Sequence, residues 1–335
     1  MKTLRACSII AAVLSLVFFL PAKDGTKAAK DPEMGRGQDL HADLAKLSRE
    51  YDISIDWTAE AEKERFAEGG LTFRGASDAD LEGYGPILIS EFNLYPKSLI
   101  RKSGLKRIIV CWDLWMESEG VKQNVSGAMD YDRKTMILCA SYTLKDNNRD
   151  KQRRVLHHVF FHFLDAALGL AGEHSEWEAL NPKEFKYGDY GRGGIHDRSS
   201  EAGLLSDKYP GFLNKYSTGY LADDKANIFA YMMVIYDYVE KRGEQDPVIR
   251  SKMDLMKSIL KQFCPDVNSG FWANVKKIKR DLTPFITLAP FSWTRSVLAV
   301  DPARERMGRR PASAAAAGDI RAIRANMYRH FYSTG

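Results

Sequence analysis

Hydrophobic and polar residues alternate at helical spacing in the first patterned part of the chain. Residues 39–51 carry leucines at positions 40, 44 and 47, on one face, which predicts an amphipathic helix. Ser77 precedes a second apolar run and suits an N-cap, because its hydroxyl can accept a hydrogen bond from a free backbone N–H group. Pro86 lies inside this second helix and is expected to bend or interrupt it.

Two β-branched, apolar runs follow, over residues 105–112 and 134–142, and they predict strands. The residues between these runs are rich in turn formers and predict an irregular connection. The pattern then becomes helical, with helices expected over 147–172, ending at Gly169 or Gly172, over 223–241, with Gly243 just past its end, and over 248–264. Strands followed by helices are typical of an α+β fold.

Composition agrees with a globular protein, since 44% of the 335 residues are hydrophobic and 28% are charged. Residues 1–22 have Lys2 and Arg5 ahead of an uncharged run over 6–20, which is typical of a secretory signal peptide and short for a membrane span. We therefore expect a secreted or periplasmic protein. An uncleaved membrane anchor stays open as the alternative, because Leu20-Pro21-Ala22 matches a cleavage site poorly.

Two polar segments flank the predicted domain, which covers residues 39–293. Residues 23–38 are rich in Lys, Asp and Gly and predict a linker. Residues 294–335 carry eight arginines against three acidic residues, which accounts for the net charge of +5 of the whole chain. Such a tail can attract nucleic acid or anionic lipid, but its Ala-rich stretch favours a solvated tail, and we predict no nucleic-acid partner.

Three cysteines lie outside the predicted signal peptide, at positions 111, 139 and 264. Their spacing does not match a metal site. Cys111 and Cys139 lie in the two strand-like runs, which favours buried thiols, with a disulfide between them as the alternative.

Two histidines stand four residues apart in RVLHHVFFHFLD, which covers residues 154–165. Four residues along a helix bring two side chains to one face, so His158 and His162 can meet one Zn²⁺ ion at about 2.0–2.1 Å each. A zinc peptidase also needs a third ligand and a carboxylate that takes a proton from the attacking water. In the HExxH pattern that carboxylate directly follows the first histidine, and here Val159 stands in its place. The residues alone leave open an amphipathic core helix with histidines on its polar edge.

Five segments, in this order, resemble the segments of a known family: YPKSLIRKSGLKRIIVCWDL, VLHHVFFHFLD, EWEALNPKEFKYG, GFLNKYSTGYLADDKANIFAYMM and KMDLMKSILKQFCPDVNSGFW. The second is similar to an HHExxHxxD pattern that lacks only its Glu. The family is a bacterial group of zinc-binding metallopeptidases, zincins of the gluzincin type, distantly similar to the catalytic domain of anthrax lethal factor. The resemblance covers residues 95–272 and implies a zincin-like fold, with a small sheet, an active-site helix and a second long helix.

The resemblance also implies roles for individual residues. It assigns the third metal position to Asn227, whose neutral amide binds zinc weakly compared with a carboxylate. Asp223 and Asp224 lie three or four residues earlier, on about the same helical face, and we take Asp224 as the candidate substitute, although both suit the start of a helix. His157 and Asp165 match the family pattern and are expected to orient the ligands without binding the metal.

Both acidic groups of the family's site are thus replaced, the general base by Val159 and the third ligand by Asn227. We therefore predict an exported zincin-fold protein without intact catalytic residues, in which zinc is weakly bound or absent. It should bind a peptide or protein in the former active-site cleft, by strand addition. Tyr216 and Tyr220 are candidates for stabilising an oxyanion in an active relative.

The alternative is an active zinc hydrolase with non-standard ligands, His158, His162 and Asp224. Such an enzyme would need His157 or an outside carboxylate as its base. His157 points about 100° away from His158 around the helix, which makes it a poor base for the same water.

Overall fold

The computed structural model of the chain describes residues 39–58, 70–118, 121–141, 149–169, 175–190 and 202–286. These residues form one sheet and a set of helices, which confirms the predicted α+β class. The elements in chain order are α1 (Leu40–Tyr51), β1 (Ser54–Asp56), β2 (Leu71–Gly75), α2 (Asp78–Phe92), α3 (Lys97–Ser103), β3 (Arg107–Ser118), β4 (Val121–Asn124), β5 (Gly127–Asp130), β6 (Thr135–Cys139), α5 (Arg149–Ala167), α6 (Ser175–Ala179), the 3-10 turn η3 (Tyr216–Thr218), α7 (Leu221–Val234), α8 (Tyr236–Gln245), α9 (Pro247–Phe263), α10 (Ser269–Lys277) and α11 (Thr283–Ile286). The predicted signal peptide (1–22), linker (23–38) and basic tail (294–335) lie outside the described residues.

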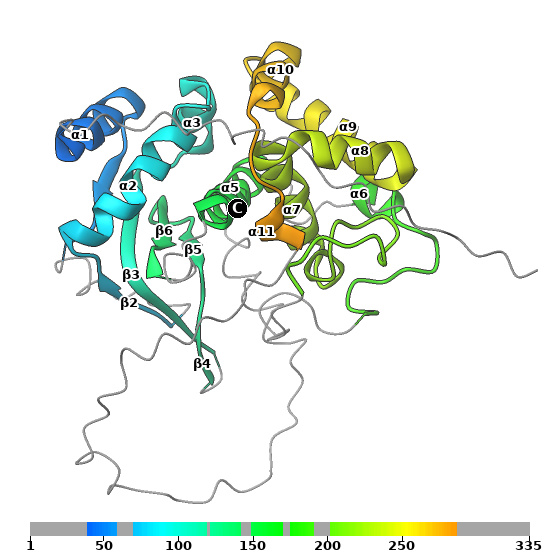
Figure 1. The fold of residues 1–335 in the computed structure, drawn as a ribbon, viewed down its shortest axis with the longest axis horizontal. Helices are drawn as coiled ribbons and strands as arrows, with labels where there is room; N and C mark the ends of the chain where they lie inside the picture. Colours follow the sequence, from blue (N-terminus) through cyan, green and yellow to red (C-terminus); the bar gives the residue numbers. More distant parts are fainter. Residues whose placement is uncertain are drawn as a thin grey trace, which may run out of the picture. The chain divides into compact units, whose positions relative to one another are not determined.

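Strand β3 is the centre of the sheet (Figure 1). Its first residues pair in parallel with β1 on one side and with β6 on the other. Its later residues pair antiparallel with β2 and with β4. Strand β5 pairs antiparallel with β6 and has no second neighbour among the described strands.

Alternate residues of β3 face opposite sides of the sheet, as the pleat requires. Ile108 and Val110 enter the main core, which they share with α1, α2, α3, α5 and α7. Ile109 and Cys111 enter a smaller cluster with side chains of β2. Helix α5 packs on β5, β6 and α2 and also on α7, so it lies between the sheet and the later helices (Figure 1).

The first two helices begin where the sequence predicts. Asp39 caps α1 by accepting from the backbone N–H groups of residues 41 and 42. Ser77 and Asp80 form a capping box at the start of α2. Pro86 was expected to bend or interrupt the helix; the interruption is wrong, because α2 continues through it to Phe92, and the bend stays a prediction. The helix is anchored by fully buried side chains on both sides of the proline, and this burial offsets the missing backbone hydrogen bond.

The two predicted strands are present as β3 and β6, but four other strands were missed. Strands β4 and β5 lie in the segment that the sequence predicted to be an irregular connection. Strands β1, β4 and β5 have only three or four residues each, too few for an alternating pattern to show. Pairing with β3 and β6, rather than local sequence preference, forms them.

The helix predicted over 223–241 is two helices, α7 and α8, that meet at Ile235. Ile235 has φ −136° and ψ 56°, which is not helical, and no glycine or proline marks this break in the sequence. Gly243, predicted just past the helix end, lies inside α8. A Cβ atom there would come within 3.3 Å of the Arg250 backbone, so the glycine permits the close approach of α8 and α9.

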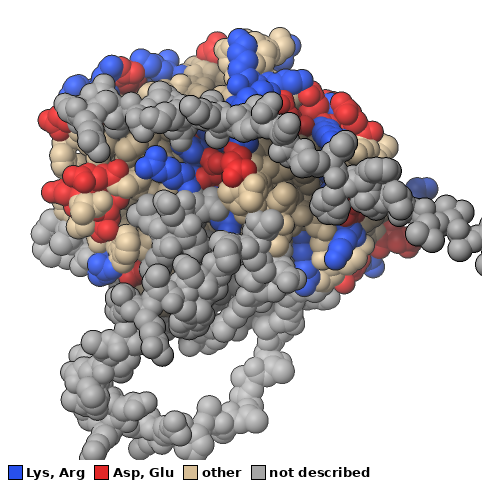
Figure 2. Space-filling model, in the orientation of Figure 1, with Lys and Arg blue, Asp and Glu red and all other residues tan. Residues whose placement is uncertain are grey.

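The predicted end of α9 before Pro265 is confirmed, and α5 ends shortly before Gly169, which has a positive φ of 68°. Cys111 and Cys139 are buried free thiols, as expected, and Cys264 is one as well. On the face seen in Figure 2, basic and acidic side chains are interspersed over the described surface. None of the described helices is long and apolar enough to cross a membrane.

A buried ionic cluster joins α2, α5 and the segment after α10. The Glu91 carboxylate accepts from Arg153 Nε at 2.9 Å, from His157 Nε2 at 2.8 Å and from Arg280 Nη2 at 2.7 and 2.8 Å. Burial opposes the charged form, but His157 and the two guanidinium groups outweigh it and lower the pKa of Glu91 to about 2. The cluster holds α5 in the core by linking it to two elements distant in sequence, α2 and the segment after α10.

Replacing Glu91 with Gln should make the unfolding free energy depend less on pH in the acid range. Because its pKa is about 2 in the folded protein against an ordinary value of 4.5, the stabilisation from Glu91 is complete above pH 4.5 and is lost as the pH falls toward 2. We expect the parent's unfolding free energy to fall in that range, and Glu91→Gln to be about 3 kcal/mol less stable at pH 7 with a weaker acid dependence. Urea unfolding between pH 3 and 7 measures this.

Glu50→Gln is the matched control, because it removes only the solvent-facing pair of Glu50 with Lys97. A Glu91→Gln protein with the same acid dependence as the parent would contradict the assignment.

Candidate metal centre

Helix α5 brings His158 and His162 together, as their spacing predicts. Their side chains are only 11% and 18% exposed, because α5 packs closely against α7. The two Nε2 atoms lie 3.1 Å apart. Two imidazole nitrogens at this distance need a proton or a cation between them, since facing lone pairs repel.

Asp223, in the first turn of α7, completes a group of three. Its Oδ1 atom is 3.6 Å from His158 Nε2 and 3.6 Å from His162 Nε2. Tyr216, from the 3-10 turn ahead of α7, donates its hydroxyl to the same oxygen at 3.3 Å. Burial raises the pKa of Asp223, but the two imidazoles lower it by more than burial raises it. The pKa therefore lies below its ordinary value, and the group is a carboxylate.

Asn227, one turn after Asp223, fixes the tautomer of His158. Its Oδ1 atom lies 3.2 Å from Arg154 Nη1 and 3.1 Å from His158 Nδ1, and its Nδ2 atom donates to Ser217 at 3.0 Å. Arginine has donors only, so the atom facing Arg154 is the amide oxygen, and His158 Nδ1 must donate to it. The lone pair of neutral His158 is therefore on Nε2, which faces His162 and Asp223.

The burial of His158 keeps its imidazole neutral. Burial is the largest cause of a pKa lowered to about 4, and the charges of His162 and Arg154 lower it too, against Asp223, which raises it. At neutral pH the ring therefore keeps its Nε2 lone pair available. A neutral imidazole with its other nitrogen hydrogen-bonded is the form in which histidine binds metals.

The three ligand atoms have the spacing of a tetrahedral metal site. Zn–N and Zn–O bonds of about 2.0–2.1 Å give ligand atoms about 3.3–3.4 Å apart in a tetrahedron. The three distances here are 3.1, 3.6 and 3.6 Å. Two neutral imidazoles and a carboxylate are also a donor set that zinc accepts, with the fourth position left for water. The residues therefore fit a zinc ion.

Asn227 and Asp224 were predicted as metal ligands, but their side chains do not join the two candidate ligand atoms of the histidines. Asn227 does face His158 across α5 and α7, but it contacts the Nδ1 atom, away from the other two ligand atoms. Asp224 is fully buried on another side of α7, where its Oδ2 atom accepts from Lys252, Trp177 and Tyr187. Successive helical residues point about 100° apart, so Asp223, and not Asp224, reaches the histidines.

His157 and Asp165 do not orient the histidine ligands. His157 donates to Glu91 and accepts from Tyr95, within the ionic cluster of α2. Asp165 forms a buried ion pair with Lys225 of α7. Both residues hold α5 in the core, and the orienting role belongs to Asn227, which the sequence analysis named as a ligand.

No described carboxylate other than Asp223 is hydrogen-bonded or ion-paired to either histidine. Val159, at the position predicted for the general base, is buried and packs against Gly127 of β5. A Cβ atom at residue 127 would come within 2.6 Å of Val159 Cγ2, so the glycine makes room for this side chain. Of the two tyrosines considered for an oxyanion, Tyr216 contacts Asp223 and Tyr220 precedes α7 as its N-cap.

The spacing between Asp223 and Asn227 in the sequence could have predicted that Asp223 faces the histidines. Asp223 stands four residues before Asn227, so a helix puts both on one face, and α7 packs against α5. The hydrogen bond from Arg154 to Asn227 could not be predicted from spacing, since it depends on which side chain of α7 lies opposite Arg154.

Comparison with known proteins adds little. No protein-family profile and no curated protein sequence matches the chain. A solved structure, that of a candidate zinc-binding metallo-peptidase from Bacteroides caccae, is similar with 14% sequence identity over 72% of this chain and 94% of its own, at a TM-score of 0.41. Identity and TM-score this low mean that the site must be argued from the chain's own residues.

The two neighbouring aspartates of α7 should differ sharply in their effect on stability. Asp224→Asn breaks a fully buried pair with Lys252 and should lower the unfolding free energy by about 3–5 kcal/mol. Asp223→Asn keeps an acceptor for Tyr216 and, without metal, should cost about 1 kcal/mol. Urea unfolding in the presence of a chelator measures both. Equal losses would contradict the separate roles assigned to the pair.

Proposed function

We propose that the chain is a zinc-binding, zincin-like domain that has lost peptide hydrolysis and binds a peptide or protein segment instead. The observation that carries zinc binding is the group His158, His162 and Asp223, with three ligand atoms at tetrahedral spacing. When bound, zinc polarises a carbonyl oxygen and lowers the pKa of a coordinated water. The carboxylate at Asp223 supports firmer binding than a site completed by an amide.

Loss of hydrolysis is supported by the surroundings of Val159. A valine cannot accept the proton that a metal-bound water must release as it attacks an amide carbon. Asp223 itself is committed to the metal and to Tyr216. Removing a general base from such a site lowers the rate by about 10²–10⁴-fold.

Peptide binding is supported by strand β5. It pairs with β6 alone among the described strands, so its other edge has no strand partner within the described residues. Gly127 of this strand contacts Val159, the neighbour of His158. An extended segment added to this edge would run past the metal ligands, with main-chain hydrogen bonds for affinity. The proposal includes export through the signal peptide at residues 1–22.

An active zinc hydrolase is the second candidate. The favouring observation is that Asp223 supplies a charged third ligand, where the sequence analysis expected a weak amide or Asp224. It still lacks a base among the described contacts of the histidines, so we rank it second.

Zinc titration tests the metal centre. The metal-free parent should bind one equivalent of zinc, and His162→Ala and Asp223→Ala should each weaken binding by about 100-fold or more, because each removes one of three ligands. Asn227→Ala should weaken it by about 10–100-fold through loss of the His158 orientation. Competition with a chromophoric chelator gives the affinities, and bound Co²⁺ should show tetrahedral visible absorption.

His41→Ala, at an exposed histidine of α1, is the control and should leave the affinity unchanged. Zinc binding by the parent that survives both ligand substitutions would refute this centre.

Restoring the missing acid tests the loss of hydrolysis. With zinc bound, Val159→Glu should cleave members of a peptide library at least about 10²-fold faster than Val159→Gln, a control of equal size that cannot take a proton. Mass spectrometry of the digests detects cleavage, which a chelator should abolish. The parent should bind the same peptides uncleaved, and chelator-sensitive cleavage by the parent would establish the second candidate. If Val159→Glu binds zinc but cleaves no better than Val159→Gln, residue 159 is not the base position.

A further inference from the structure

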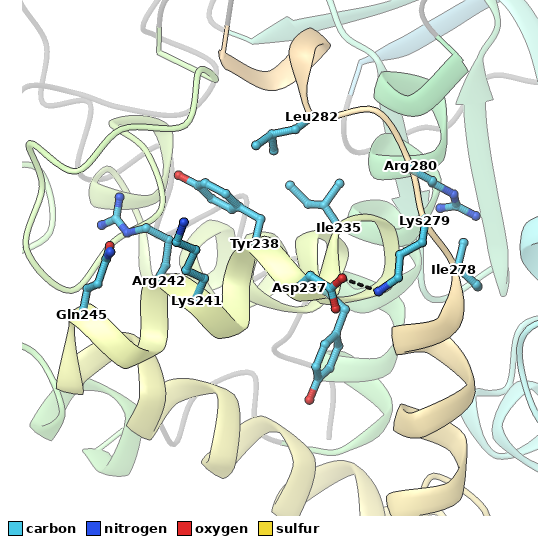
Figure 3. Close-up of a pocket in the computed structure, with 11 residues that line it drawn as sticks. Ile235, Asp237, Tyr238, Lys241, Arg242, Gln245, Ile278, Lys279, Arg280 and Leu282 are labelled. Carbon is cyan, nitrogen blue, oxygen red and sulfur yellow. Dashed lines mark hydrogen bonds and ion pairs between the residues drawn. The ribbon is translucent and has the colours of Figure 1, made fainter. Parts of the chain in front are cut away.

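A cavity separate from the metal centre lies between helix α8 and the segment that follows α10. Its volume is about 480 Å³, which is enough for a small organic molecule. Figure 3 shows side chains of α8 on one side and of the segment from Ile278 to Leu282 on the other. The lining residues are Ile235, Tyr236, Asp237, Tyr238, Lys241, Arg242, Gln245, Ile278, Lys279, Arg280 and Leu282.

The lining of this cavity is strongly positive. Four basic side chains, Lys241, Arg242, Lys279 and Arg280, contribute to it, against one acidic side chain, Asp237. Asp237 is paired with Lys279. Arg280 donates from its Nη2 atom to both carboxylate oxygens of Glu91. The positive charges of Lys241 and Arg242 remain, since neither has an ion pair or a side-chain hydrogen bond with a described residue.

Arg242 is the unusual member of the group. The residue is only 7% exposed, yet its Nε atom is buried without a hydrogen-bond partner. The Nη1 atom of Arg280, at the opposite wall, is also buried without a partner. A buried guanidinium nitrogen without an acceptor is unfavourable, because it has lost its hydrogen bonds to water and gained none from the protein. Such a group is expected where a ligand supplies the acceptor.

The rest of the lining is apolar or aromatic. Ile235 lines the cavity from the start of α8, and Ile278 and Leu282 line it from the segment after α10, while Tyr238 extends from α8 (Figure 3). Gln245 adds a neutral donor and acceptor one turn after Lys241. Sites that combine apolar walls with a few convergent polar groups are typical of small-molecule binding.

We propose that this cavity binds a small organic anion, with a carboxylate or phosphate group on Arg242 and Lys241 and an apolar body against Ile235, Ile278 and Leu282. Guanidinium groups bind both kinds of anion through paired, charge-assisted hydrogen bonds. Arg280, fixed by Glu91, adds positive potential from the far wall. The site does not depend on the metal centre.

Two probes with the same aromatic body test the proposal and separate the two anion types. Phenyl phosphate and phenylacetate are titrated by calorimetry into the full chain, stripped of metal by a chelator so that neither anion can ligate zinc. Benzyl alcohol is the neutral probe. At least one anion should bind with one-to-one stoichiometry, the alcohol should not, and the stronger anion identifies the head group.

Arg242→Gln should weaken that binding by about tenfold or more, since it removes the charge-assisted contact. Lys261→Gln, at an exposed lysine of α9, is the matched control and should bind as the parent does. A structural arginine would lower the melting temperature when replaced, whereas removal of an unpaired buried charge should leave the ligand-free melting temperature unchanged or raised. The proposal is overturned if neither anion binds, or if Arg242→Gln binds as tightly as the parent.

Discussion

The hydrogen bond from His158 Nδ1 to Asn227 Oδ1 governs the chemistry available at the centre of this protein. It joins α5 to α7, and Arg154 fixes its direction by occupying the same amide oxygen. A neutral ring has one donor and one acceptor nitrogen, so this bond decides which nitrogen faces His162 and Asp223. Asn227 thus acts on the side of the imidazole opposite to the other two candidate ligand atoms.

Helix α5 is unusual in burying polar groups around most of its circumference. His157 belongs to the cluster of Glu91, His158 and His162 to the centre with Asp223, and Asp165 to the pair with Lys225. Each group has its own counter-charge, from α2 for His157 and from α7 for the other two, so desolvation is offset locally. Separate partners also explain why adjacent histidines on one helix carry out unrelated tasks.

The sequence predicts the long elements and the histidine pair because both depend on local spacing. The span of α1, the cap of α2, the strands β3 and β6 and the end of α9 were predicted from residues close together in sequence. The short strands and the break at Ile235 could not be predicted, since pairing and packing with distant residues determine them. In the site, the resemblance to the metallopeptidase family, and not the spacing, led to the prediction that the third group comes from the helix that carries Asn227. Choosing between Asp223 and Asp224 required the helix rotation, which Lys252 and Trp177 fix from outside α7.

The three candidate ligands belong to α5 and α7, the two helices whose mutual contact forms much of the core. An ion held between them would therefore act as a cross-link through the centre of the fold. Any species that binds only the native chain adds to its stability, by about 2.7 kcal/mol when present at 100 times its dissociation constant. Resistance to heat and proteolysis would then vary with the supply of metal in the surroundings, whether or not the chain ever performs chemistry.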